Sequence, residues 1–210
     1  MSGLLDLLNG PMGKQLINGV AGQTGRSKSE TGNVLSMALP ILMGAMKRNA
    51  ASPEGAQGLM SALAGKHDGG ILDNLGNLFD GGVDDSVMQD GTGILSHVLG
   101  GKQTQVENAL SSKSGMDAGT IATILKVAAP ILMGYLGKQT RQQNVSSSNG
   151  IGDLLGGLMG AGNTGNQQQS LIESFLDSDG DGSILDDVAS MALGNKKGGI
   201  GGLLGGLFGK

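Results

Sequence analysis

Two runs of the chain are apolar on almost every side of a helix, and each predicts a helix buried at the centre of the fold. They cover residues 34–46 and 124–136, and each contains a proline, Pro40 or Pro130. Proline removes one backbone hydrogen bond and disfavours helical geometry in the residue before it. We therefore expect each helix to kink or split, around residues 38–39 and 128–129, into a buried hairpin.

The two runs also predict an internal duplication. Residues 35–44 and 125–134 are identical at seven of ten positions, at an offset of 90. Ser27 and Asp117 occupy equivalent positions before the runs, and both are residue types that cap helix N-termini. Ser27 with Glu30 has the spacing of a capping box. The sequence thus predicts two related helical units, roughly 1–50 and 90–142.

The remaining pattern predicts an all-α fold with a small C-terminal hairpin. We expect a first helical unit with its connector (1–89), a second helical unit (90–142), a linker rich in Gly, Ser, Asn and Gln (143–169), a helix-loop-helix hairpin (170–195) and a flexible Gly/Leu tail (196–210). Glycine accounts for 41 of the 210 residues without a collagen period, so short helices punctuated by glycine are expected.

Net charge, cysteine content and the length of apolar runs bear on the expected partners and on the expected cellular location. The net charge is −4, which gives no basic field for nucleic acid, so nucleic acid is not an expected partner. The chain has no cysteine, and this does not settle the redox compartment. We see neither a Sec signal nor a run of 18 apolar residues, and a cytoplasmic location is favoured.

Aspartates at alternate positions predict a calcium-binding loop between residues 177 and 188. Asp177, Asp179 and Asp181 alternate along the chain, and Gly182 permits the sharp turn that lets carboxylates face one ion. Three carboxylates this close repel one another unless a cation lies between them. The alternative is an acidic surface turn without metal.

The loop departs from the EF-hand and dockerin pattern at its last position. Position 12 is Val188, where those loops carry an acid. The Ser183 backbone carbonyl and either Asp186 or Asp187 would complete the Ca²⁺ site, since adjacent helical positions point about 100° apart. Ser183 as a helix cap would make Asp186 the capping-box acid and leave Asp187 better aimed at the ion.

Four motifs together resemble the YidB-like family of uncharacterised bacterial proteins. They are Gly-Gly-Ile-Leu-Asp-Asn-Leu-Gly at 69–76, the segment 90–103, the Ala-Pro-Ile-Leu-Met-Gly block at 129–134 and the aspartate-rich loop. The resemblance implies an all-α bacterial domain. It supplies no catalytic residues, because the family's function is unknown.

The two histidines are weak candidates for chemistry. His97 lies among apolar residues, and a core or capping role is expected for it. His67 could join Asp68 and Asp73 in a metal site, but the Asp-Gly-Gly turn favours a solvated loop. Neither a nucleophile elbow nor a phosphate-binding loop is present in the sequence, so an enzyme is not expected.

The sequence therefore predicts a non-enzymatic calcium-binding scaffold or interaction module, whose partner is another protein or a second copy. The alternative is a peripheral membrane protein whose Gly/Leu segments, at 152–160 and 199–210, engage lipid.

Overall fold

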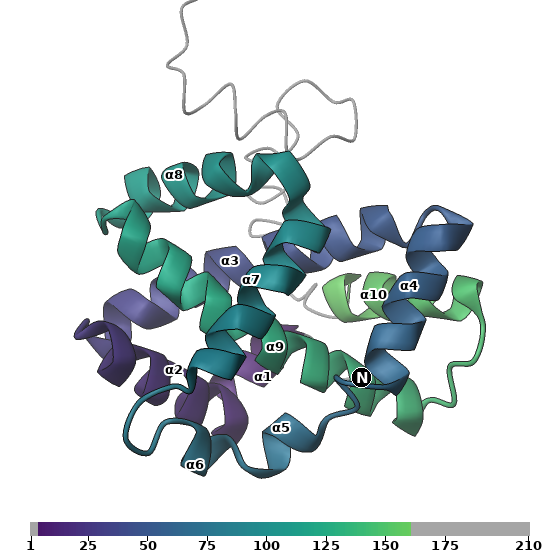
Figure 1. Ribbon diagram of the computed structural model, residues 1–210, viewed down its shortest axis with the longest axis horizontal. Coiled ribbons are helices and arrows are strands. Elements are labelled where there is room, and N and C mark those ends of the chain that lie inside the picture. Colours follow the sequence, from purple (N-terminus) through teal and green to yellow (C-terminus); the bar gives the residue numbers. More distant parts are fainter. Residues whose placement is uncertain (1–3, 161–210) are drawn as a thin grey trace, which may run out of the picture.

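The computed structural model describes residues 4–160, and all regular structure in that part of the chain is helical (Figure 1). This confirms the all-α fold class. The helices are α1 (Leu4–Asn9), α2 (Pro11–Thr24), α3 (Lys28–Asn49), α4 (Pro53–Ala64), α5 (Gly70–Asp73), α6 (Leu75–Leu78), α7 (Asp85–Leu99), the 3₁₀ turn η1 (Gly100–Lys102), α8 (Gln103–Ser114), α9 (Ala118–Gln142) and α10 (Ser148–Gly160).

Helices α3 and α9 form the centre of the molecule, as the two apolar runs predict. Helix α9 contacts α2, α3, α4, α5, α7 and α8, and α3 contacts α1, α2, α4, α7, α8, α9 and α10. Leu35, Leu42 and Leu125 are completely buried, and Ile131 is 2% exposed. The matched residues of the two runs are all buried, with exposed fractions of 0 to 6%: Leu35, Ile41, Leu42, Leu125, Ile131 and Leu132.

The prediction that each helix splits into a hairpin at its proline is wrong. Helix α3 runs without a break through Pro40, and α9 runs without a break through Pro130, so neither forms a hairpin. A proline in a helix costs one backbone hydrogen bond and a steric conflict with the preceding turn. Packing on nearly every side compensates for that cost, because residues 127–137 of α9 are all buried.

The predicted helix starts are confirmed. The Ser27 side chain accepts a hydrogen bond from the Glu30 backbone N–H, and the Glu30 carboxylate accepts from the Ser27 backbone N–H, which completes the capping box. Asp117 caps α9 by accepting a hydrogen bond from the Thr120 backbone N–H at 2.8 Å. Each side chain thereby satisfies a backbone donor that the first helical turn leaves free.

The connections that lead into these two caps, which we call corners, have the same backbone conformation. Helix α2 is capped at its C-terminus by Gly25 and helix α8 by Gly115, both in the left-handed conformation, with φ of 65° and 74°. One residue separates each glycine from the cap of the next helix. Glycine suits this position because it has no Cβ to oppose a positive φ.

Residues 148–160, which lie inside the segment predicted to be a linker, form helix α10. Ile151, Leu154, Leu155 and Leu158 are 0 to 5% exposed. Their spacing places them on one face of a helix, and that face packs against α3 and α4 (Figure 1). Glycine content suggested a linker, but burial of this face stabilises a helix that glycine alone would weaken.

One described helix, α9, is long and apolar enough by length and composition to cross a membrane. Within its most apolar window, 72% of the residues are buried inside the protein. Such burial is what the core helix of a globular fold shows, and the finding is weak evidence for a membrane span.

Candidate functional site

The predicted calcium ligands, Asp177, Asp179, Asp181, Ser183, Asp186 and Asp187, lie outside the described residues, as does the hairpin 170–195. In the described part of the chain, no group of three or more His, Asp or Glu side chains could hold a metal ion.

An open groove of about 510 Å³ lies between α2 and the segment 75–82. Its lining combines amide side chains, glycines and two apolar side chains: Gln15, Asn18, Gly19, Gly22, Gln23, Leu75, Gly76, Phe79 and Gly82. The Gln23 side chain accepts a hydrogen bond from the Val83 backbone N–H at 3.1 Å and ties the two walls together. A groove of this kind offers hydrogen bonds and an apolar floor at the same time.

Glycines set the shape of this groove. The Phe79 ring lies where a side chain at Gly19 would otherwise stand, while a Cβ added at Gly22 or Gly76 would have no atom within 4 Å. The ring is therefore held against α2, and the surface beside it stays open.

The second candidate site is a polar cluster around His67, which is 8% exposed. His67 Nδ1 lies 3.8 Å from Asp90 Oδ2, and Lys66 Nζ donates to Asp90 Oδ1 at 2.6 Å. Burial lowers the pKa of His67, and the opposing attraction of Asp90 only partly offsets it. The imidazole is consequently held neutral near pH 7.

The prediction of a solvated loop at His67 is therefore wrong, and so is a core position for His97. His97 is exposed on α7, because the buried positions of that helix are Gly91, Ile94, Leu95 and Leu99. This period places residue 97 on the opposite face. The Asn49 side chain donates to the His97 backbone carbonyl oxygen at 3.3 Å.

Asp68, next to His67, is paired with the end of α9. Arg141 donates to the Asp68 carboxylate at 3.2 Å and to the Asp68 backbone carbonyl. The backbone N–H of Gly70 and then the charge of Arg141 lower the pKa of Asp68. Asp73, the third member of the candidate metal cluster, is exposed.

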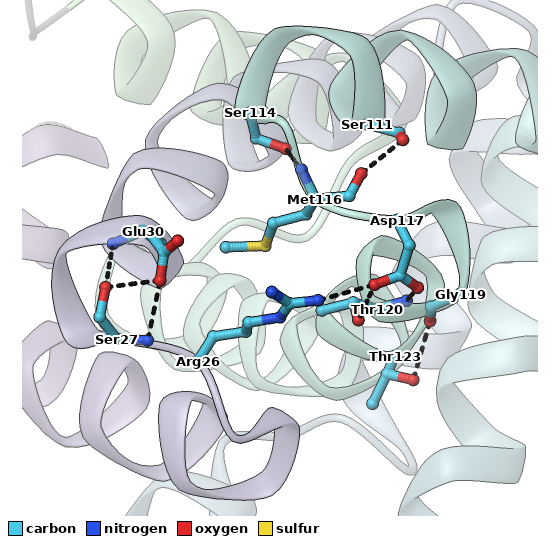
Figure 2. Close-up of polar contacts among 10 residues, drawn as sticks. All are labelled: Arg26, Ser27, Glu30, Ser111, Ser114, Met116, Asp117, Gly119, Thr120 and Thr123. Atoms are coloured by element: carbon cyan, nitrogen blue, oxygen red, sulfur yellow. Dashed lines mark hydrogen bonds and ion pairs between the residues drawn. The ribbon is translucent and has the colours of Figure 1, made fainter.

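The starts of α3 and α9 form a third cluster, in which the two corners meet (Figure 2). Arg26, in the first corner, donates to the Asp117 carboxylate of the second corner at 2.8 Å. Hydrogen bonds from the Thr120 hydroxyl and backbone lower the pKa of Asp117 to about 2. Hydrogen bonds from Ser27 likewise lower the pKa of Glu30.

Two serines close the second corner around a buried methionine. Ser111 donates to the Met116 carbonyl oxygen, and the Met116 backbone N–H donates to the Ser114 hydroxyl at 3.2 Å (Figure 2). Met116 is 3% exposed. Arg26 and Met116 occupy equivalent places in the two corners, so one corner projects a charged side chain and the other buries an apolar one.

The fold and these clusters define an all-α protein. Its acidic side chains with lowered pKa values cap helices or join the ends of helices. The sequence matches DUF937, described as a bacterial protein of unknown function, over residues 6–139 and 142–210, and the chain belongs to this family. The expected membership in an uncharacterised bacterial family is thus confirmed. No curated protein and no solved structure matches the chain.

Proposed function

We propose that the protein is a non-enzymatic, calcium-binding helical interaction module. The observation that carries the proposal is the alternation of Asp177, Asp179 and Asp181 followed by Gly182. Hard cations take six to eight oxygen ligands, and this spacing supplies three carboxylates from one tight loop. The Ser183 carbonyl and Asp187 or Asp186 supply further oxygens.

The affinity should be moderate. Val188 stands where a strong loop carries a bidentate acid, so one ligand must come from a neighbouring position. We therefore expect sensor-range or weaker affinity, with a dissociation constant of about 10⁻⁶ to 10⁻⁴ M. The bound ion would stabilise the folded form of the short hairpin 170–195, because helices below about 12 residues are rarely stable alone.

The non-enzymatic part of the proposal is supported by the roles of the described acids. Asp117 and Glu30 have lowered pKa values because they accept the hydrogen bonds of helix starts. Asp68 and Asp90 pair with Arg141 and Lys66. A perturbed pKa that has a complete structural explanation gives no independent reason to infer catalysis.

We also propose that the two units are structural duplicates, with the α2–α3 corner equivalent to the α8–α9 corner. The shared left-handed glycines, caps and central prolines, all at an offset of 90, support this equivalence. A repeated unit offers two similar surfaces, which suits binding to a protein partner or to a second copy. The proposals of a protein partner and of a cytoplasmic location are based on the sequence alone.

The membrane alternative loses one of its two segments. The leucines of 152–160 are the buried contacts of α10, so they are not presented to lipid in this structure. The remaining segment, 199–210, lies outside the described residues. An interaction module is therefore the better-supported function.

Titration calorimetry tests the calcium site. After removal of bound metal with a chelator, the full chain should release or absorb heat on addition of calcium, with one ion per chain. Asp179→Ala should abolish the signal, because it removes one of the three alternating carboxylates. Asp80→Ala, which removes an exposed acid outside the loop, should leave it unchanged. A wild-type chain without heat at millimolar calcium refutes the proposal.

A further inference from the structure

Helix α10 packs against both α3 and α4 with four apolar side chains, and we call the surface that it covers on these two helices the groove. Ile151, Leu154, Leu155 and Leu158 recur at the i, i+3, i+4 and i+7 spacing of one helix face, and each is at most 5% exposed. Figure 1 shows α10 lying alongside α4, reached by a short connection from the end of α9. These side chains are the anchors of α10.

The C-terminal segment 199–209 repeats the sequence of α10. Residues 150–160 and 199–209 are identical at nine of eleven positions, at an offset of 49. All four anchors are retained, as Ile200, Leu203, Leu204 and Leu207.

The two differences fall where α10 tolerates change. Position 153 is exposed, and the tail carries Gly202 in place of Asp153. Position 159 is half-buried, and there Phe208 replaces Met159. Neither substitution removes a contact that a fully buried anchor makes.

The glycines between the anchors are retained as well. Gly156 passes the end of the Lys47 side chain, whose Nζ lies 3.7 Å from a Cβ built at that position. The equivalent residue in the tail is Gly205, so the copied segment would present the same small surface to α3.

Two other segments of similar composition lack an anchor. In the segment 70–78, Asn74 takes the place of Leu154, and this segment forms α5 and α6 instead of one helix. In the segment 3–13, Pro11 takes the place of Leu158. The tail is the copy that keeps all four anchors, so the match is specific to α10.

We propose that the groove between α3 and α4 is a docking site for residues 199–209 of the same chain, which compete with α10 for it. Tethering favours the same chain over a second copy, because two segments of one chain meet at an effective concentration near the millimolar range. The groove therefore has two interchangeable occupants, and binding of either one frees the other.

The connection to each occupant sets the balance between them. Residues 143–147 join α9 to α10, whereas residues 143–196 would join α9 to the docked tail. The entropy of loop closure scales with three-halves of the logarithm of loop length, which favours α10 by roughly 35-fold. Helix α10 is thus the resident, and the tail takes over when α10 is weakened.

Substitutions in the full chain test this exchange, with excess chelator present so that the result does not depend on the calcium loop. Leu155→Asp places a charge on the buried face of α10 and prevents its docking. The tail should then occupy the groove. Hydrogen exchange should show new protection at 199–209 and lost protection at 150–159, with a folding equilibrium constant roughly 35-fold below that of the wild type.

The second substitution, Leu204→Asp, prevents residues 199–209 from docking in place of α10. Leu204→Asp alone should leave stability unchanged, while Leu155→Asp with Leu204→Asp should lose far more stability than the two single changes together. Gly202→Asp serves as the matched control, because it gives the tail the acid that α10 carries at the exposed position 153. Combined with Leu155→Asp, it should preserve the new protection at 199–209.

Three results would overturn the proposal. The first is a Leu155→Asp chain that fails to fold or that shows no new protection at 199–209. The second is a double variant no less stable than Leu155→Asp alone. The third is protection at 199–209 that appears only together with a dimer in light scattering, which would assign the exchange to two copies instead of one chain.

Discussion

Gly91 lies where α7 crosses α9, and replacing it with alanine tests whether the close packing of these helices holds the core together. A Cβ built on Gly91 would lie 2.6 Å from the carbonyl carbon and 2.8 Å from the Cα of Lys126, and nearer still to the carbonyl oxygen. Ordinary Cβ contacts begin near 3.4 Å. Because the obstacle is backbone, α7 must move away from α9 by roughly 1.5 Å, and no side chain can absorb the clash by rotating.

The expected free-energy change has two opposing parts. Overpacking of this kind costs about 1–3 kcal/mol, while alanine in place of glycine favours a helix by about 0.5–1 kcal/mol. Gly91→Ala should therefore destabilise the protein. Gly93→Ala, two residues further along α7, has no atom within 4 Å of the new methyl group and should stabilise it by about 0.5–1 kcal/mol.

Denaturant unfolding of the two variants provides the comparison. The free energies of unfolding should differ by about 2 kcal/mol, with the wild type between them, and the dependence on denaturant should stay the same. If Gly91→Ala is as stable as Gly93→Ala, the described crossing of α7 and α9 is incorrect.

Three further outcomes can be checked by the same unfolding measurements. Thr31 is completely buried with an unpaired hydroxyl, so Thr31→Val should stabilise the protein by about 1 kcal/mol, and a loss of stability would reveal a hidden partner. Burial holds the pKa of His67 below 6.5, so the folded state binds fewer protons than the unfolded state and stability should fall as the pH drops through 6.5; His67→Asn should flatten this fall. The pKa of Asp117 is lowered from 3.8 to about 2, so its contribution is complete above pH 4 and is lost towards pH 2. Asp117→Asn, which keeps a capping oxygen, should remove that acid-range loss, and an unchanged profile would contradict the assigned pKa.

Local sequence signals predicted the elements whose causes are themselves local. The capping box of Ser27 with Glu30 and the cap at Asp117 need only residues within one helical turn, and both are present. The buried runs around Leu35 and Leu125 were visible because no surface helix carries so few polar residues.

The misses arose where tertiary packing outweighs local preference. Pro40 and Pro130 do not interrupt their helices, because packing around the helices offsets a lost hydrogen bond. Helix α10 was hidden by its glycines, although the spacing of Ile151, Leu154, Leu155 and Leu158 was a readable signal. His67 is buried beside Asp90, which belongs to a helix distant in sequence, and no local pattern could have indicated this contact.

Native mass spectrometry of the full chain is the most direct test of the calcium-binding account. Wild-type protein, stripped of metal and then exchanged into about 10⁻⁴ M calcium, should carry one added calcium ion, and Asp179→Ala under the same conditions should carry none. A wild-type chain without the added ion, or an Asp179→Ala chain that retains it, would contradict the assignment of calcium to residues 177–187.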